Sequence, residues 1–425
     1  MPVPASDDAD ILIVGAGVSG LVCALRAQEL GLKALILEKD TVPGGRVGTS
    51  QHGDCRTDHG FQILLTAYPE VQRFLNLDAL DLGFFSRGAH IWEGKNWRSL
   101  VAPVDEPAAL KASLFNAPLQ FGDYLRLAKT IWSGQKADWT TTFTQEACST
   151  LRFLEADGFS NTAIELFFKP FLGGVFLDDK LETSAAMFRF VMDMFARGRA
   201  ALPAGGMEAI PEQLVTRLDG GTLRTDCPVA SINVSNRTVH LEDGTSLQSR
   251  AIVVATDAHV ASQFFPDALP KIPFNASRAW CFRMERDNRP KEINKTLRLI
   301  SDPQNPLRLI ACPSAVASGY APSGVDTVTI TPKVGAEDLE ESAVRKSLKT
   351  VLGSCVETWD LIAKYHIPRS LPRQQAPDFK SMPGTMKLYD HVYLSGDAYH
   401  TRSLNGAMLS GRLAAEAIAQ NPTTS

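Results

Sequence analysis

Residues 11–38 constrain the fold of this chain more than any other stretch. The run Ile11 to Val14 is short, apolar and β-branched, which favours a buried parallel strand. A segment of helical character follows, and a second apolar run, Ala34 to Leu37, leads directly to Glu38. Between the first run and the helix stand three glycines with the spacing of a phosphate-binding turn: Gly15, Gly17 and Gly20. This order predicts a strand, turn, helix and strand unit that binds the ADP half of a dinucleotide.

Each residue of the glycine turn has its own expected role. Gly15 lets the chain turn sharply at the strand end, and Gly17 lets the backbone approach a pyrophosphate. Gly20 removes side-chain bulk where the helix must lie close to the sheet. Val18 and Ser19 open the helix, whose N-terminal N–H groups favour the phosphate charge.

A carboxylate and a second glycine turn extend the expected site. Glu38, with Lys39 beside it, stands where a carboxylate accepts hydrogen bonds from ribose hydroxyl groups. Shortly after it, Gly44 and Gly45 expose backbone N–H groups, and Arg46 can give a charge-assisted fork to the pyrophosphate or hydrogen bonds to the chain beyond. These residues predict a turn that encloses the phosphates from the side opposite the helix.

Composition excludes several classes of function. Charged residues make up 21% of the 425 and the net charge is −4, so no phosphate-tracking surface is expected and nucleic acid is excluded as a partner. The seven cysteines are scattered without a Cys-x-x-Cys pair, which indicates a reducing compartment, no redox dithiol and no metal site. No secretory signal and no apolar run of about 20 residues is present. We expect a cytoplasmic protein without a transmembrane helix, and leave peripheral membrane contact open.

The order of elements predicts an α/β fold made of separated segments. Amphipathic helices dominate from about 96 to 200, and Met187 to Phe195 is expected as a buried helix or the wall of an apolar tunnel. Strands are expected at 228–234, 251–255, 327–331 and 392–394, and helices at 210–218, 337–352 and 406–418. We therefore predict a discontinuous Rossmann-like domain of residues 1–95, 200–265 and 385–425, with an inserted α+β substrate domain of residues 96–199 and 266–384.

With these motifs in order, the chain resembles the flavin-containing amine oxidase and phytoene desaturase superfamily. This superfamily includes protoporphyrinogen oxidases and hydroxysqualene dehydroxylases. The segment 170–176 and the turn Gly60 to Gln62 resemble its protoporphyrinogen oxidase and carotenoid desaturase side. The resemblance implies a domain of the glutathione reductase type that binds FAD. Besides the residues above, it places the following near the cofactor: Gly60, Phe61, Val229, Ala255, Gly396, Asp397, Asn405, Gly406, Ala407 and Met408.

The resemblance also implies the chemistry. FAD takes a hydride from a C–H bond of a small apolar molecule, and the protein orients that molecule and excludes water. Backbone N–H groups of Ala407 or Met408 are expected to face the flavin ring. Five side chains on loops that flank the expected ring position are candidate catalytic groups: His59, Gln62, Tyr399, His400 and Arg402.

The branch of the superfamily stays open at this stage. A second Gly-x-Gly-x-x-Gly turn is missing, so reoxidation by oxygen, a quinone or another carrier is simpler than a nicotinamide domain. Ser403 stands where amine oxidases carry a tyrosine, which lowers the odds of amine oxidation without excluding it. A reduced-flavin-dependent isomerase and a flavin-stabilised binding protein that turns nothing over remain alternatives.

Overall fold

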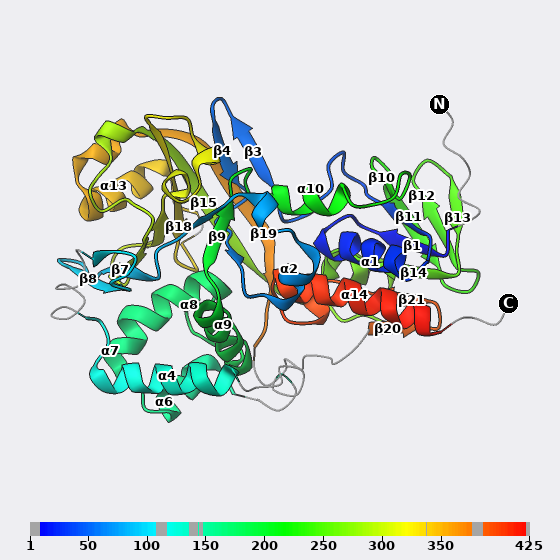
Figure 1. Ribbon diagram of the computed structural model, residues 1–425, viewed down its shortest axis with the longest axis horizontal. Helices are drawn as coiled ribbons and strands as arrows, with labels where there is room; N and C mark the ends of the chain where they lie inside the picture. The colour runs from blue at the N-terminus through cyan, green and yellow to red at the C-terminus, as the bar shows by residue number, and fades with distance from the viewer. Residues whose placement is uncertain are drawn as a thin grey trace.

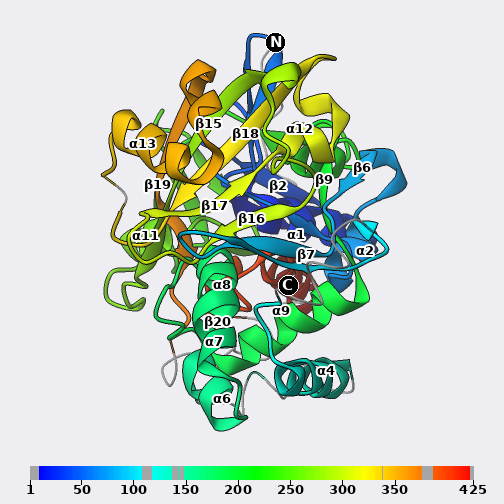
Figure 2. The ribbon, with the colours of Figure 1, turned by 90° about the vertical axis from the view of Figure 1, so that its left-hand side faces the viewer.

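The computed structural model describes residues 9–107, 117–135, 143, 148–336, 338–375 and 386–421. Two large β-sheets lie toward opposite ends of its long axis, and a group of helices lies beneath the second sheet (Figure 1). Figure 2 views the molecule from the end of this second sheet, whose strands pass above the helical group. The two sheets and the helical group meet near the middle of the molecule, and this junction is where a functional site is expected (Figure 1).

The first sheet combines strands from three separate parts of the chain. β1 (Ile11–Val14) is paired in parallel with β2 on one side and β14 on the other, in the order β10-β2-β1-β14-β21-β20. Its other strands are β2 (Ala34–Leu37), β10 (Leu223–Arg224), β14 (Ala251–Val254), β20 (Met386–Tyr389) and β21 (Val392–Leu394). The expected Rossmann-like sheet is confirmed.

Alternate side chains of β1 enter two different cores. Ile11 and Ile13 face the helical side, whereas Leu12 and Val14 face a three-stranded meander, because successive residues of a strand point to opposite faces. The meander contains β11 (Val229–Asn233), β12 (Thr238–Leu241) and β13 (Ser246–Gln248). This double burial explains why the strand is apolar at every position.

Two helices from opposite ends of the chain lie together on this sheet (Figure 1). They are α1 (Val18–Glu29) and α14 (Leu404–Gln420). A Cβ atom at Gly411 would lie 2.2 Å from the carbonyl oxygen of Ser19, so the small residues of α14 are what allow the contact. Arg412 of α14 forms a bidentate ion pair with Glu70 at 2.8 and 2.9 Å, which ties α14 to α2 (Pro69–Phe74).

The second sheet has seven strands in the order β19-β15-β18-β17-β16-β7-β8. Leu299 and Leu309 face the main core, which the helical group shares, and Ile300 and Ile310 face a separate core under α13 (Glu341–Leu352). The strands are β7 (Gly88–Trp92), β8 (Trp97–Val101), β15 (Phe274–Glu285), β16 (Leu297–Ile300), β17 (Leu307–Ala311), β18 (Val325–Pro332) and β19 (Asp360–Pro372).

The helical group completes the second half of the molecule. Its members are α4 (Phe121–Gln135), α6 (Thr150–Ala156), α7 (Asn161–Ala163), a π-helical turn (Ile164–Phe168), α8 (Lys169–Phe176) and α9 (Ala185–Arg197). Most of α9 is buried, from Ala185 to Met194 except Arg189, which confirms the expected core helix. None of the helices in the described part of the chain is long and apolar enough to span a bilayer.

The remaining elements connect these layers. The strands among them are β3 (Thr49–His52), β4 (Cys55–Asp58), β5 (Leu64–Leu65), β6 (Leu82–Phe84) and β9 (Ala200–Pro203). The helices are α10 (Ala209–Val215), α11 (Ala258–Phe264) and α12 (Pro313–Val316). Single helical turns occur at Asp78–Leu80, Arg286–Asn288, Ser318–Tyr320, Ser354–Thr358 and Asp397–Tyr399.

Several expected boundaries differ from the structure, among them the start of one helix and the limit of one domain. The helix expected from residue 337 begins at Glu341, because Glu340 is extended; residue 337 itself lies outside the described residues. The hairpin of β7 and β8 belongs wholly to the second sheet, and the domain boundary expected at residue 95 falls inside it. A boundary near residue 87 suits the sheets better, and the division into two domains stays a proposal.

Candidate functional site

The three glycines after β1 have three different environments. Gly15 has a φ of +104°, and its N–H group donates to the carbonyl of Leu37, which joins the turn to β2. A Cβ atom at Gly20 would lie 2.1 Å from the carbonyl oxygen of Gly15, so a side chain there collides with the turn. A Cβ atom at Gly17 would meet no protein atom within 4 Å, because it would project into an open cavity. Gly17 therefore leaves room for a ligand rather than for the protein.

Glu38 is held at the end of β2 by backbone donors. One carboxylate oxygen accepts from the N–H of Ala16 at 2.6 Å and the other from the N–H of Asp40 at 3.0 Å. A carboxylate has about four lone-pair sites, so acceptor capacity remains for ribose hydroxyl groups. Glu38 is buried but lines the same cavity as Gly17. Lys39 also lines it, and its ammonium group pairs with Asp40 at 3.0 Å.

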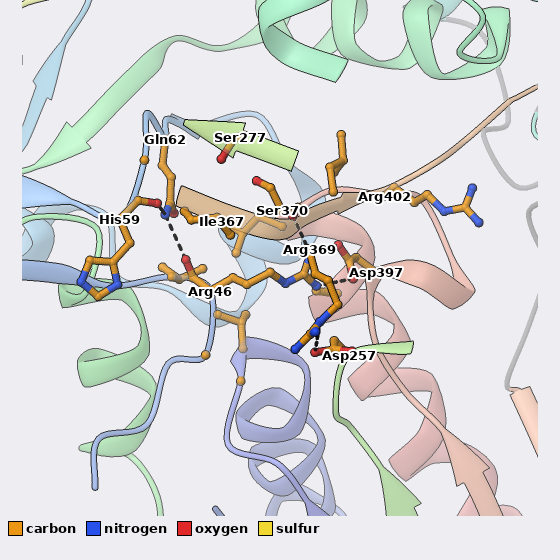
Figure 3. A pocket seen from close by; sticks show the side chains of 18 of the residues that line it. Arg46, His59, Gln62, Asp257, Ser277, Ile367, Arg369, Ser370, Asp397 and Arg402 are labelled. Carbon is orange, nitrogen blue, oxygen red and sulfur yellow. Dashed lines mark hydrogen bonds and ion pairs between the residues drawn. The ribbon is translucent and has the colours of Figure 1, made fainter. Parts of the chain in front are cut away.

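Arg46 and Asp397 form the central ion pair of the cavity (Figure 3). The guanidinium group donates to the two carboxylate oxygens of Asp397 at 2.6 and 2.9 Å and to the carbonyl of Ser370 at 2.8 Å. Desolvation acts to lower the pKa of Arg46, but the charge and hydrogen bonds of Asp397 and the charge of Asp257 raise it overall. The fork expected for a pyrophosphate thus goes to Asp397, which leaves Arg46 positioned to give its other N–H groups to a ligand.

A second ion pair lies near the first and was not predicted. The guanidinium group of Arg369 on β19 is 3.4 Å from a carboxylate oxygen of Asp257, whose other oxygen caps α11 through the N–H groups of His259 and Val260 (Figure 3). Asp257 follows directly after the strand at 251–255, at the carboxyl edge where ligands bind in parallel sheets, and this position was a usable signal. Nothing in the local sequence distinguishes Arg369.

The turn at 57–64 lies further along the cavity, which His59 and Gln62 both line. The amide nitrogen of Gln62 donates to the carbonyls of Arg46 and His59, both at 3.0 Å, and so links the two turns. The ring of His59 hydrogen-bonds Ser50 at 2.8 Å, and in Figure 3 it points away from the Arg46–Asp397 pair. Burial, with a contribution from His52, lowers the pKa of His59, which favours the neutral ring.

Of the three candidates after Asp397, only Arg402 lines the cavity. Burial, partly offset by Asp397, lowers the pKa of Arg402 to about 10, so it stays charged at neutral pH. Tyr399 packs instead in the core beneath the meander. Burial and then the charge of Arg412 lower the pKa of His400 to about 4, and its Nδ1 accepts from the N–H of Thr401 at 2.8 Å. The structure gives Tyr399 and His400 no access to the cavity described here.

The helix expected after Asn405 begins earlier than expected. Ser403 is the N-cap of α14, and its hydroxyl accepts from the N–H of Gly406 at 3.1 Å. The N–H of Ala407 already donates to the carbonyl of Ser403 at 3.0 Å, so Ala407 and Met408 are not the backbone donors of the helix end. The first N–H groups of a helix lack intrahelical partners, and here they belong to Leu404 and Asn405.

Most of the residues expected at the cofactor line one continuous cavity of about 670 Å³. This volume lies within the usual range for ligand pockets. The expected residues on its wall are Gly15, Gly17, Val18, Ser19, Glu38, Lys39, Gly44, Gly45, Arg46, Gly60, Phe61, Val229, Ala255, Gly396, Asp397 and Ala407. Four expected residues do not line the cavity: Gly20, Asn405, Gly406 and Met408. Gly20 packs on the turn and Gly406 packs on Thr401. The side chain of Asn405 accepts from the N–H of Glu70, and Met408 is fully buried.

Beyond Gln62, the same cavity becomes apolar and is lined by α9, which was expected as a buried helix or a tunnel wall, and by α8, which was not expected to line a cavity. Phe171, Val175 and Phe176 come from α8, and Met187, Val191 and Phe195 come from α9. The rings of Phe171 and Phe195 are 5.3 Å apart. We call this part the apolar half of the cavity and the part from Glu38 to Asp397 the nucleotide half.

The nucleotide half fits an extended dinucleotide cofactor. Glu38 offers acceptors at one end, the open space over Gly17 suits a pyrophosphate, and the N-terminus of α14 lies at the other end. The described residues contain no group of three or more His, Cys, Asp or Glu side chains that could hold a metal ion. All seven cysteines are free.

Comparison with known proteins agrees with this geometry. Residues 18–419 match the family model for flavin-containing amine oxidoreductase. The chain is 23% identical over 462 aligned positions to the 15-cis-phytoene desaturase of Capsicum annuum, covering 97% of this chain and 78% of that protein.

Solved structures share the fold at low sequence identity. An oxidoreductase from Methanosarcina mazei superposes with a TM-score of 0.73 at 15% identity, covering 96% of this chain and 99% of that one. A putative protoporphyrinogen oxidase from Exiguobacterium sp. 255-15 gives 0.70 at 14% identity, covering 97% and 99%. With the cavity and the family match together, this chain belongs to the flavin-containing amine oxidoreductase family and is an FAD-dependent oxidoreductase.

Proposed function

We propose that this protein removes a hydride from a C–H bond of an apolar substrate, as a desaturase, dehydrogenase or oxidase of isoprenoid-, carotenoid- or porphyrinogen-like molecules. One observation carries the proposal: the apolar half opens into the nucleotide half as a single cavity. A substrate in the apolar half therefore lies next to the cofactor without crossing solvent. The phytoene desaturase relative supports the same substrate class.

The wall of the apolar half is built for hydrocarbon. Met187 and Val191 are almost fully buried in the protein core, yet their side chains border the cavity. Phe171 stacks on Phe167 with an interplanar angle of 8°, which holds its ring as a fixed surface. Removal of apolar surface from water contributes roughly 25 cal/mol per Å², so a long apolar molecule binds here without specific polar contacts.

A bound FAD would supply the hydride acceptor. The chain supplies position and exclusion of water. Gln62 acts as a positioning residue, because its amide joins the turns of Arg46 and His59 beside the cavity. Arg402 brings a positive charge to the same wall at neutral pH. Hydride removal of this kind needs no strong acid or base, which agrees with the neutral, hydrogen-bonded state favoured for His59.

Amine oxidation is less well supported. Ser403 occupies the place before the closing helix where amine oxidases carry an aromatic ring, and its hydroxyl caps α14. A small capping side chain cannot form one wall of an aromatic cage around an amine.

Anaerobic reduction of the bound cofactor tests the proposal. We expect phytoene or protoporphyrinogen to bleach the visible flavin absorbance of the purified holoprotein and to yield a product with two fewer hydrogens for each flavin reduced. Bleaching by amines alone would instead establish an amine oxidase, and a rearranged product of unchanged mass would establish an isomerase. If no class of candidate substrate bleaches the flavin, a flavin-stabilised binding protein that turns nothing over is favoured.

The same preparation identifies the electron acceptor and tests whether the protein binds membranes. Rapid mixing of the reduced protein with oxygen or with a quinone shows which acceptor restores the absorbance of the oxidised flavin. Sedimentation with lipid vesicles tests the peripheral membrane contact.

A further inference from the structure

Three cations lie together on the wall of the cavity. Arg278 is on β15, Arg308 is on β17, and Lys333 follows β18, which lies between those two strands in the sheet. The N–H of Lys333 donates to the carbonyl of Pro306 at 2.8 Å, which places the end of β18 beside the start of β17. All three side chains line the cavity, and we call them the cationic cluster.

Arg308 belongs to the structure of the apolar half and is not a surface charge. Its side chain is 4% exposed and lies against α8, where Phe171, Val175 and Phe176 originate. A Cβ atom at Gly173 would lie 2.3 Å from a guanidinium nitrogen of Arg308, and one at Gly174 would lie 3.5 Å from its Cδ. The paired glycines of α8 thus make room for this guanidinium group.

The charges of the cluster are only partly balanced by the protein. Arg308 pairs with Asp179, whose second oxygen accepts from the N–H of Val334 at 3.0 Å. Arg278 pairs at 3.0 Å with Asp338, a side chain that is 98% exposed and therefore strongly screened by water. Lys333 donates to the carbonyl of Asp302.

The acidic side chains that line the cavity lie away from the cationic cluster. Among the described lining residues, the acidic side chains are those of Glu38, Asp40, Glu242, Asp257 and Asp397. Glu38 and Asp40 are at the end of β2, and Asp257 and Asp397 follow β14 and β21, so these four lie at the carboxyl edge of the first sheet. The cationic cluster on the second sheet thus borders the apolar half with three positive charges.

Desolvation makes this arrangement favourable for an anion. Burial lowers the pKa of Arg308, although the charge of Asp179 acts against it. Burial and the charge of Arg308 lower the pKa of Lys333, although Asp302 and Asp179 act against them. Cations that burial destabilises are stabilised by an opposite charge, and hydrogen bonds to charged groups are stronger than neutral ones. The acids that offset the cluster, Asp179, Asp302 and Asp338, are not among the residues that line the cavity, so a ligand anion on the cavity side meets the cations without an acid beside it.

We propose that the substrate of this enzyme has an anionic end group, a carboxylate or a phosphate, which binds the cationic cluster while its apolar body lies along α8 and α9. The inference rests on the proposed function and narrows its substrate to anionic amphiphiles. Lys333 and Arg278 are then specificity-determining residues, and Arg308 fixes the geometry of the cluster.

Calorimetric titration of the holoprotein tests this without turnover. The ligands are decanoate, decyl phosphate, neutral decanamide and decyltrimethylammonium, which share the length of their chain and differ in end group. We expect at least one of the two anions to bind about tenfold or more tightly than decanamide, and the cation to bind more weakly. The order of decanoate and decyl phosphate identifies the anion.

Variants assign the preference to the cluster. In Lys333→Gln with Arg278→Gln, the anion should lose its advantage while decanamide keeps its affinity. Lys349→Gln, which removes an exposed lysine of α13 outside the cavity, should bind all four ligands like the parent. Arg308 is left unchanged because its burial makes a folding defect a competing explanation.

The outcomes separate the two proposals. Equal binding of anion and amide by the parent protein, or equal loss of both in the double variant, would overturn the anionic end group and leave an apolar substrate standing. Failure of all four ligands to bind would contradict the apolar cavity itself and both proposals with it. Retention of the anion preference in the double variant would also refute the role of the cluster.

Discussion

The two halves of the cavity are assembled in different ways. The nucleotide half uses backbone turns, chiefly Gly15 to Gly17 and Gly44 to Arg46, within a short stretch of chain. The apolar half uses side chains from α8, α9 and the second sheet, which meet only after the chain has folded. Backbone geometry therefore shapes the nucleotide half, and side-chain packing shapes the apolar half.

This difference predicts that the halves respond differently to mutation. In the nucleotide half, adding a side chain should matter most, because ligand and helix approach bare backbone. In the apolar half, a polar substitution should matter most, because one apolar side chain of the wall can be replaced by another of similar volume at little cost. The following changes test that contrast, from the largest expected effect to the smallest.

Gly20→Ala should have the largest effect, on folding itself. Its Cβ would lie 2.1 Å from the carbonyl oxygen of Gly15 and 3.3 Å from the Cβ of Ala255. Overpacking against backbone costs about 3 kcal/mol or more. A urea titration of the apo-protein followed by circular dichroism measures the loss, and an unchanged midpoint would contradict the close packing of α1 on the turn.

Acidification should destabilise the fold through His400, which is buried and does not line the nucleotide half. With a pKa of about 4 against an ordinary 6.5, the unfolded state binds the proton first, so this stability is complete above pH 6.5 and is lost as pH falls toward 4. The full effect is on the order of 3 kcal/mol. His400→Asn should flatten the dependence of the urea midpoint on pH between 7.5 and 4; a slope equal to that of the parent would refute the assignment.

Gly17→Val should release the cofactor and leave the fold intact. Its φ of −65° suits any residue, and its Cβ meets no protein atom within 4 Å. The side chain would occupy the space over the turn, so FAD affinity should fall about a hundredfold, or about 2.7 kcal/mol. Flavin content after dialysis measures it, and the urea midpoint of the apo-protein controls for folding. Full retention of FAD would show that the cofactor does not approach Gly17.

Val175→Gln should have the smallest effect and should touch only the apolar half. Val175 is partly exposed on the cavity wall, so a polar side chain there should weaken binding of decanamide about tenfold without loss of FAD. Val104→Gln, at a valine that is 72% exposed outside the cavity, is the matched control. If the two variants bind decanamide alike, the apolar half does not hold the ligand.

Local backbone requirements made much of the nucleotide half predictable from the sequence. A buried parallel strand, a glycine with positive φ and a carboxylate after the next strand are all encoded within residues 11–38. Hydrogen bonds from Gly15 to Leu37 and from Ala16 to Glu38 join the turn to the end of the second strand, as those signals imply. The start of α14 was missed by two residues, because Ser403 caps the helix before Asn405. Cap choice depends on a single hydroxyl and is a weak signal in sequence.

Only the tertiary structure decided the rest. The pairing of Arg46 with Asp397 joins positions 351 residues apart, and the burial of Tyr399 and His400 outside the cavity follows from which face of their turn meets the core. The cationic cluster arises because β15, β18 and β17 are neighbours in the second sheet, although their order along the chain is different. Contacts within one turn of chain are set by local conformational energy, whereas these depend on how sheets and helices pack, which no short stretch of sequence encodes.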